Sequence, residues 1–534
     1  MSEGAAKKEE KPRKFQAIRG TRDLLPPETA LWNRAEQTAH QVFASFGFGE
    51  IRLPIFEPTE LFARSIGEET DVVSKEMYSF LDNPDISNLE EARDAIKEVN
   101  PGIAAVGKQE VFELYVSEFI SQIEAGLAGK QLNLSSKAQS DFDIVKARFQ
   151  ELLALPDSKD EDRHNKRRHL TFEIIIKVDL LKFGERVSLR PEATASVCRA
   201  YIEHGMQQLP QPVKLYYMGP MFRRERPQKG RYRQFYQIGA EVLGGSDAPA
   251  IDAEVIEMVM TFFDRLELQG VQLDVNSIGC LNCRPKYVEL LRAALLKVKD
   301  KLGPDSQRRI ETNPLRVLDS KLESEQPIIA TLPHIADHLC EECAVHYAAV
   351  KHQLKMRGVI YRENWRLVRG LDYYMRTTFE ITAQGLGSQN AVCGGGRYDG
   401  LVELLGGPPT KGIGFAIGED RLILSLQESG KAPVQQGRDV YIAWMGERAQ
   451  ATAIRAAKDL RKAGFSVELP PVEQKFGKAL GQADKLGAKY ALILGDNEVS
   501  EGLWTLKTLA DGSQAKFTEP DLLEHLSMQK ALSS

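Results

Sequence analysis

The stretch MFRRERPQKGRYRQFYQIGAEVLG, residues 221–244, constrains the fold more than any other part of this chain. Strand-like residues flank a loop with Pro227 and Gly230, which predicts a hairpin. Five arginines fall in this segment: Arg223, Arg224, Arg226, Arg231 and Arg233. Guanidinium groups bind phosphate oxygens bidentately and stay charged at any working pH. The segment could therefore hold a phosphoryl group on rigid strands, or it could be a solvated basic surface paired with Glu225.

Two common nucleotide-binding signatures are missing from the sequence. It has no GxxxxGK[ST] loop, and the GGG at 394–396 lacks the strand and helix that surround a GxGxxG loop. A phosphate site in this chain would therefore be built from arginines.

A second group of polar residues suits an amino group or an imidazole. Glu192 and Thr194 lie in LRPEATA, while Gln237 and Glu241 lie at the end of the arginine segment. Carboxylates beside an amide can bind an ammonium group, but the same carboxylates could instead be internal ion pairs serving the arginines. RGLDYYMRTTFEI, from Arg369, places a cation and two phenols, Tyr373 and Tyr374, at the start of a predicted strand.

The length of 534 residues favours two to four domains. Strand-like runs occur at 51–58, 187–189, 213–218 and 235–242, and residues 284–356 look mostly helical. Residues 426–438 read as a polar linker. After it, strands and helices alternate over 439–534, which predicts a separate α/β domain with a largely parallel sheet.

Residues 83–182 differ in character from their surroundings. Charged residues and helix formers are frequent, and apolar residues recur at spacings of one, three and four. We expect a small helical module here, with a strand at 172–178.

Composition and the N-terminus bear on where the protein acts. The net charge of −5 means that any contact with nucleic acid would use local patches. No apolar run approaches the about 18 residues that span a bilayer, so no membrane partner is expected. Residues 1–14 have no apolar core and read as a disordered tail, not a secretory signal. With only six cysteines, a reduced cytoplasm is the expected setting.

Several of these stretches together resemble the motifs of class II aminoacyl-tRNA synthetases. The arginine segment resembles motif 2, IRLPIFEP from Ile51 resembles motif 1, and GIGFAIGEDRLILSL from Gly412 resembles motif 3. RGLDYY and AVCGGGRYDGL resemble two signatures peculiar to the histidyl-tRNA synthetase family, and RGTRDLLP fits the same family. The resemblance covers all but the tail and residues 83–182.

The resemblance implies a fold and a domain order for this α/β protein. An α+β catalytic domain with an antiparallel sheet would comprise 15–82 and 183–425, with a helical insertion at about 284–356. Residues 83–182 would be an inserted module of unknown role, because the family joins the strands on either side by a short turn. Residues 439–534 would be an anticodon-binding domain. Motif 1 implies a homodimer with C₂ symmetry.

The resemblance also implies a reaction, in which histidine and ATP form an adenylate and histidine then passes to tRNA(His). Arg223 and Arg369 would hold the α-phosphate, Arg231 and Arg421 would bind the rest of ATP, and Mg²⁺ would bridge the outer phosphates. The histidine pocket would be built by these residues: Glu192, Thr194, Gln237, Glu241, Tyr373, Tyr374 and Tyr398. Gly394–Gly396 would let backbone pass close to the ligand. Arg226 and Gln228 would contact the tRNA. RHNKRRH, residues 163–169, could contact tRNA phosphates or be a solvated charge cluster.

One rival interpretation is the synthetase-like regulatory subunit of ATP phosphoribosyltransferase, which binds histidine without charging tRNA. Such paralogues lack the anticodon domain and degrade the motif 2 arginines, whereas this chain keeps both. A prolyl or threonyl enzyme would lack RGLDYY and GGGRYDG.

Four of the cysteines form two CxxC pairs, Cys280 with Cys283 and Cys340 with Cys343. This is ligand spacing for a tetrahedral zinc site. The segment between the pairs is longer than usual, and the family does not require zinc. Structural zinc and buried or incidental thiols are therefore both open.

Overall fold

The computed structural model describes residues 15–67, 70–82, 87–98, 109–128, 134, 136–155, 160–181, 185–386, 390–431 and 437–533. They form two compact units, with main segments 36–429 and 430–534. The predicted tail, 1–14, lies outside the described residues, as do 432–436 of the predicted linker. The first residues of that linker, 426–428, belong instead to a helix, because their apolar and polar residues continue the periodicity of the preceding turns.

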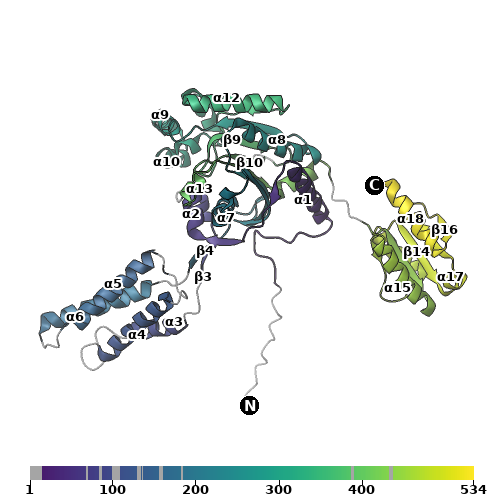
Figure 1. Ribbon diagram of the computed structural model, residues 1–534, viewed down its shortest axis with the longest axis horizontal. Helices are drawn as coiled ribbons and strands as arrows, with labels where there is room; N and C mark the ends of the chain where they lie inside the picture. Colours follow the sequence, from purple (N-terminus) through teal and green to yellow (C-terminus); the bar gives the residue numbers. More distant parts are fainter. Residues whose placement is uncertain are drawn as a thin grey trace, which may run out of the picture. The chain divides into compact units, whose positions relative to one another are not determined.

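An eight-stranded sheet forms the centre of the larger unit (Figure 1). Its strands, in order across the sheet, are β1 (Gly49–Glu50), β5 (Val213–Phe222), β6 (Gln234–Leu243), β11 (Gly412–Gly418), β10 (Ala391–Arg397), β9 (Met375–Thr382), β7 (Gln272–Ser277) and β8 (Arg362–Glu363). The two outermost pairs are parallel and all other neighbours are antiparallel. The expected antiparallel catalytic sheet is therefore present, within a mixed α/β protein.

The predicted hairpin is the pair β5–β6, which runs from Val213 opposite Leu243 to Phe222 opposite Gln234. We expected the five arginines to lie on the strands of this hairpin. They lie instead in the loop 223–233, beyond the ends of both strands. The loop is still tied across its base, because the Arg223 N–H donates to the Arg233 carbonyl at 2.9 Å.

Helices surround this sheet (Figure 1). They are α1 (Glu28–Ser45), α2 (Thr59–Ile66), α7 (Thr194–Glu203), α8 (Pro249–Arg265), α9 (Arg284–Leu296), α10 (Pro304–Thr312), α11 (Gln326–Ile329), α12 (Glu341–Met356), α13 (Leu401–Leu404) and α14 (Glu419–Glu428). Phe43 of α1 packs against Tyr216 and Phe415 of the sheet, with ring centres 5.4 and 6.0 Å apart. The residues from α9 to α12 are mostly helical, as predicted.

The predicted strand at 51–58 is wrong as a single element. β1 ends at Glu50, and β2 (Phe56–Pro58) pairs instead with β4 (Glu185–Leu189) in a second, three-stranded sheet. Pro54 has no N–H to continue a ladder. The segment between the strands is held by the buried Arg190, whose Nη1 donates to the carbonyl oxygens of Leu53 and Pro54 at 2.9 and 3.1 Å.

The third strand of this small sheet, β3 (Ser79–Asp82), is antiparallel to β4. The described residues between β3 and β4 form four helices, α3 (Ser87–Glu98), α4 (Gln109–Ala128), α5 (Ser136–Leu153) and α6 (Glu161–Leu180), which share their own apolar core. The expected strand at 172–178 is wrong, because it lies inside α6. Its β-branched residues suggested a strand, but Ile174 and Val178 are buried one helical turn apart.

The smaller unit has a five-stranded sheet, in the order β13 (Val467–Glu468), β12 (Val440–Met445), β14 (Tyr490–Gly495), β15 (Trp504–Thr508) and β16 (Gln514–Phe517). Its helices are α15 (Glu447–Lys462), α16 (Phe476–Lys485), α17 (Asp496–Glu501) and α18 (Glu519–Ser533). The first three strands are parallel, but β15 and β16 are antiparallel to their neighbours. The connection through the short α17 cannot make the crossover that a parallel neighbour requires. No helix in the described parts of either unit is long and apolar enough to span a bilayer.

Candidate active site

A cavity of about 460 Å³ opens in the larger unit where the loop 223–233, the segment before β9 and the start of α14 meet. Its lining includes these predicted site residues: Glu192, Thr194, Arg223, Arg231, Gln237, Arg369, Tyr373, Tyr374 and Arg421. Segments far apart in the sequence thus contribute to one cavity, whose lining combines arginines with carboxyl groups and tyrosines.

Four arginines line the cavity, together with Lys321. Arg223 donates from Nε to the Pro191 carbonyl oxygen at 2.9 Å, and Arg421 donates from Nη1 to the Ala391 carbonyl oxygen at 2.9 Å. These backbone contacts fix the direction of both side chains. Burial, and next the charge of Arg231, lowers the pKa of Arg421. An anionic ligand would relieve this crowding of like charges.

The pairing with Glu225 that we considered as an alternative does occur. Glu225 Oε2 lies 3.1 Å from Arg231 Nη1, and Oε1 lies 3.9 Å from Arg223 Nη1. Yet all three residues line the cavity and are not spread over an outer surface.

Arg369 reaches the cavity from the segment before β9. Its Nη1 lies 3.2 Å from Glu380 Oε2, and its guanidinium carbon lies 5.6 Å from the centre of the Tyr374 ring. Gly394 on the neighbouring strand β10 lies directly beneath, and any side chain there would collide with this guanidinium. The first glycine of GGG therefore makes room for Arg369. The other two, Gly395 and Gly396, pack closely against neighbouring strands, while Gly394 also lines the cavity.

Glu192 is fixed at the start of α7. Its carboxylate accepts hydrogen bonds from the backbone N–H groups of Thr194 and Ala195, at 2.7 and 3.0 Å. A negative charge is favourable at this end of a helix, although burial raises the Glu192 pKa.

Glu241 lies one layer deeper, on β6, and has no exposed surface. Thr194 donates from Oγ1 to its Oε1 at 2.7 Å, and the Tyr398 hydroxyl donates to its Oε2 at 2.6 Å. Burial raises the pKa of Glu241 to about 8. Gly414 of motif 3 lies opposite, where any side chain would overlap this carboxyl group.

The carboxyl groups are therefore not partners of the arginines. Within the part of the chain that the structure describes, neither Glu192 nor Glu241 forms an ion pair with an arginine, which argues against the internal ion-pair interpretation. Tyr373 packs between Tyr374, which lines the cavity, and Tyr398, which bonds to Glu241. Its ring centre lies 4.7 Å from that of Tyr374 and 5.8 Å from that of Tyr398. The Gln237 Oε1 atom is buried without a hydrogen-bond partner among the described residues, on the cavity wall.

The two predicted tRNA residues lie elsewhere. Arg226 and Gln228 are exposed at the tip of the loop 223–233 and do not line the cavity. The tip is a tight turn in which the backbones of Gln228 and Arg231 bond to each other in both directions, at 3.1 and 2.9 Å. The four CxxC cysteines also lie outside the cavity, where they come together as a cluster.

Sequence reasoning missed three acidic residues of the cavity lining, Asp319, Glu380 and Asp420. Glu380 sits on β9 between the buried Phe379 and Ile381, so a charge inside an apolar strand was the available signal. Asp420, next to Arg421, accepts from the Tyr236 N–H at 2.9 Å and from Arg22 Nη2 at 3.1 Å. It thereby ties the N-terminal RGTRDLLP stretch to the cavity.

Comparison with known proteins identifies the family. A family model described as histidyl-tRNA synthetase matches residues 153–422, and one described as an anticodon binding domain matches residues 439–529. A curated relative from Solibacter usitatus named "Histidine--tRNA ligase" is 44% identical over 513 residues, covering 96% of this chain and 99% of its own. A second relative of that name, from Koribacter versatilis, is 45% identical over 512 residues and 95% of each chain.

A solved structure is similar over nearly the same span. Apo histidyl-tRNA synthetase from S. aureus has a TM-score of 0.65 at 30% identity, covering 96% of this chain and all of the other. The relatives, the family model and the cavity built from class II motifs agree, and the chain belongs to the histidyl-tRNA synthetase family.

Proposed function

We propose that this protein attaches L-histidine to the 3′ end of tRNA(His), with ATP entering as its magnesium complex. The observation that carries the proposal is one cavity whose lining combines four arginines with Glu192, Gln237, Tyr373 and Tyr374. The direct test is charging of a tRNA(His) transcript with labelled histidine. A folded protein that fails to charge this transcript contradicts the proposal.

In the first step, a carboxylate oxygen of histidine attacks the α-phosphorus of ATP. The bond to the bridging oxygen breaks and pyrophosphate leaves, so histidyl-adenylate remains. The histidine carboxylate is already ionised, so no general base is needed. The enzyme must neutralise the charge that grows on the α-phosphate and hold the reactants in line.

The arginines of the cavity are suited to this task. Arg223 and Arg369 come from different segments, the β5–β6 loop and the segment before β9, and can contact the α-phosphate from two sides. Arg231 and Arg421 would bind the outer phosphates and the remainder of ATP. The ion pairs of Arg231 with Glu225 and of Arg369 with Glu380 hold two of these arginines in place before ATP binds.

The carboxyl side of the cavity would bind the amino acid. Glu192, Thr194 and Gln237 would take the α-amino group, and the buried Gln237 Oε1, which has no hydrogen-bond partner among the described residues, supports this because it can accept from an ammonium group. Glu241, Tyr374 and Tyr398 would contact the imidazole, with Tyr373 packed between the two tyrosine rings. A pocket that pairs both ring nitrogens rejects apolar analogues, because its own polar groups would be left unpaired.

In the second step, a hydroxyl of the terminal ribose of tRNA attacks the adenylate carbonyl and AMP leaves. Replacing both Arg226 and Gln228 by alanine should slow charging about tenfold, the loss expected for one or two base contacts. Pyrophosphate exchange should be unchanged, because neither residue lines the cavity. An equal fall in both assays, or none in charging, would contradict this assignment.

The regulatory-subunit alternative is not favoured. The matched anticodon binding domain spans residues 439–529, and the motif 2 arginines are intact and line the cavity. We propose that the C-terminal unit binds the anticodon stem.

We further propose a homodimer formed through the small β2–β4–β3 sheet. Ile55, Phe56, Phe80 and Leu81 expose between 37% and 54% of their surface on or beside its two outer strands. Sedimentation velocity should give a dimer for the full chain and a monomer for Phe56→Asp. The matched control is Phe172→Asp, an exposed phenylalanine of similar accessibility on α6, which should stay dimeric. A monomeric wild type would contradict the proposal.

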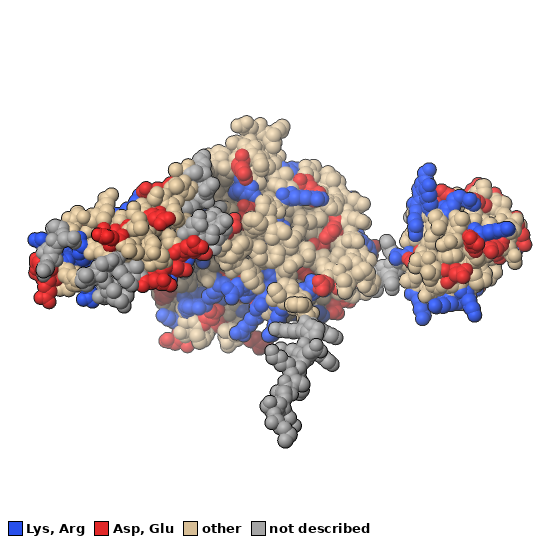
Figure 2. Space-filling view, turned by 90° about the horizontal axis from the view of Figure 1, so that it is seen from below, with Lys and Arg blue, Asp and Glu red and all other residues tan. Residues whose placement is uncertain are grey.

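The four-helix stretch between β3 and β4 is proposed to be an accessory module. Its apolar core is self-contained, and the cavity draws none of its lining from it. Acidic and basic side chains are interspersed on the face of this module seen in Figure 2, which favours a solvated charge cluster for 163–169. Two basic residues there pair locally, Lys166 with Glu151 at 3.0 Å and Arg163 with Asp160 at 3.6 Å.

Deleting this module tests the accessory role. Asp82 and Glu185 lie opposite each other, so a two-residue Asn-Gly turn in place of residues 83–184 can close the β3–β4 hairpin. Pyrophosphate exchange should stay within about threefold of the full chain, because only loop closure changes. Loss of exchange in a folded deletion protein would show that the module is required for catalysis.

A further inference from the structure

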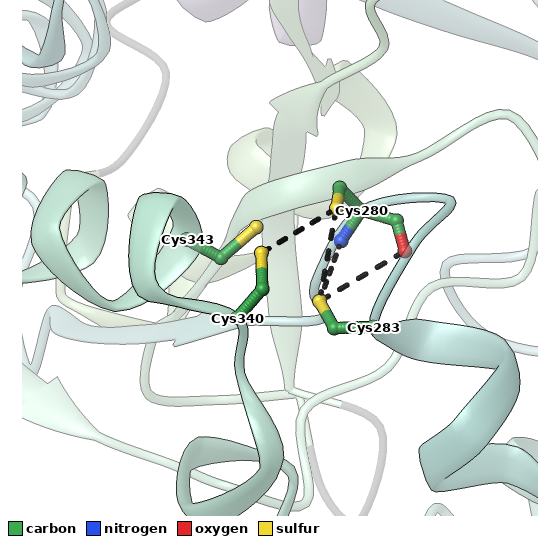
Figure 3. Close-up of side chains that lie close together, drawn as sticks. All are labelled: Cys280, Cys283, Cys340 and Cys343. Carbon is green, nitrogen blue, oxygen red and sulfur yellow. Dashed lines mark hydrogen bonds between the residues drawn. The ribbon is translucent and has the colours of Figure 1, made fainter.

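The two CxxC pairs come together at the base of the helical insertion (Figure 3). Cys280 and Cys283 lie between β7 and α9, while Cys340 and Cys343 lie at the start of α12. The Cys280 sulfur is 3.8 Å from the sulfurs of both Cys283 and Cys340, and all four sulfurs lie within 4.8 Å of one another. The chain between the pairs therefore leaves this point and returns to it.

These separations fit a metal better than a disulfide. A disulfide requires sulfurs about 2.05 Å apart, and all four cysteines are free. Sulfurs about 2.3 Å from a central zinc, at the corners of a tetrahedron, are about 3.8 Å apart. We propose that Cys280, Cys283, Cys340 and Cys343 bind one structural Zn²⁺. Four protein ligands leave no open position for a catalytic water.

The surroundings of the cluster also suit a thiolate site. The Cys280 N–H donates to the Cys283 sulfur at 3.3 Å, and the Asn282 N–H donates to the Cys280 sulfur at 3.4 Å. Such bonds stabilise the negative charge on metal-bound sulfur. Gly279 has a φ of +70°, and a side chain there would approach the Cys283 sulfur at 2.8 Å. Glycine is therefore needed at the turn that presents the first pair.

The cluster is joined directly to the segment that carries the cavity tyrosines. Arg284, which follows Cys283, donates from Nη1 to the Tyr374 carbonyl oxygen at 2.5 Å. The Arg376 N–H donates to the Gly279 carbonyl at 2.8 Å, and the Ile278 N–H donates to the Arg376 carbonyl at 2.8 Å. A bound zinc would thus hold the segment that carries Tyr373 and Tyr374 in position through these hydrogen bonds. This positioning role rests on the proposed function, whereas metal binding does not.

The first test measures metal in the full-length protein purified without chelators. One zinc per chain is expected, with little iron. Exchange of the zinc for Co²⁺ should produce the strong visible absorption and the sulfur-to-cobalt charge-transfer band of tetrahedral thiolate coordination. Zinc well below one per chain, iron in its place, or cobalt without these bands would overturn the proposal.

The second test separates zinc binding from its effect on the cavity. Cys340→Ala should lose the zinc, and Cys340→His should retain it because imidazole replaces thiolate in Cys₃His sites. Cys198→Ala, which removes a buried thiol outside the cluster, is the matched control and should keep one zinc. A Cys340→Ala protein that still holds one zinc would overturn the assignment of ligands.

Histidine-dependent pyrophosphate exchange reports the positioning role. In Cys340→Ala, KM for histidine should rise about tenfold, and kcat should change less. Loss of a residue that supports a site typically costs about 10–100-fold, and we expect the lower end of this range. Cys340→His should restore KM. An unchanged KM in zinc-free protein would overturn the positioning role. A wild-type protein with one zinc per chain but no histidine-dependent pyrophosphate exchange would support the metal site and contradict the proposed function.

Discussion

An Arg369→Gln variant should lose histidine-dependent pyrophosphate exchange by about 10²–10³-fold, the loss seen when one donor to a developing oxyanion is removed. Glutamine retains a hydrogen-bond donor but has neither the positive charge nor the guanidinium fork. The loss should fall on kcat, because the contact strengthens as charge grows on the α-phosphate. The measurement is exchange of labelled pyrophosphate into ATP at saturating histidine.

Three controls make this result specific. Arg366→Gln changes an arginine three residues away that bonds to Gln326 Oε1 and does not line the cavity, so exchange should stay near wild type. Arg369→Lys should be intermediate, since it keeps the charge without the fork. Removing Arg369 also frees the charge of Glu380. Exchange that recovers in Arg369→Gln combined with Glu380→Gln would show that the freed carboxylate, not a lost phosphate contact, caused the defect.

A Glu241→Gln variant should raise KM for histidine about 10–100-fold, which corresponds to the roughly 1.5–3 kcal/mol of a charge-assisted hydrogen bond. In the wild type, both carboxyl oxygens are already bonded to Thr194 and Tyr398. An imidazole N–H placed against them would favour the ionised carboxylate, which an amide cannot provide. KM for ATP serves as the internal control and should not change. A parallel rise in both KM values would place Glu241 in general pocket stability instead of histidine recognition.

The same variant has a signature in the ligand-free protein. The pKa of Glu241 is raised from 4.5 to about 8 by burial. Between these two values the folded state keeps a proton that the unfolded state has released. Stability contributed by this group therefore falls as pH rises from about 4.5 to about 8 and is constant outside that window.

Glutamine does not titrate, so thermal unfolding of the two proteins should diverge with pH. From pH 5.5 to 8, the unfolding midpoint of the wild type should fall by several degrees relative to that of Glu241→Gln. Midpoints that change in parallel would mean that Glu241 titrates near its ordinary value in the folded protein.

Motifs with local spacing could be predicted from the sequence, whereas features that depend on packing between distant segments could not. The hairpin at 221–244 was predictable because strand-like residues flank a loop with Pro227 and Gly230. The cavity arginines followed from their residue type. The different surroundings of Glu192 and Glu241 could not be predicted from the sequence. They depend on α7 beginning at Thr194 and on Gly414 leaving space for the Glu241 carboxyl group.

Two wrong predictions have the same physical origin, because contacts with other parts of the chain overrode the local preference for a strand. The β-branched run at 172–178 favours a strand in isolation, but its buried positions pack one face of α6 into a helical core. Residues 51–55 alternate like a strand, yet the Arg190 side chain, and not a neighbouring strand, donates to the carbonyl groups of Leu53 and Pro54. Likewise, Asp420 became interpretable only when the structure brought Arg22 to it.

The most direct test of the central claim is exchange of labelled pyrophosphate into ATP by the wild-type chain, with histidine, proline, threonine and glycine supplied one at a time. Exchange with histidine alone is the predicted result. It would show that the cavity forms histidyl-adenylate. No exchange from folded protein, or exchange driven equally by another of these amino acids, would contradict the account of the arginines and of the carboxyl pocket.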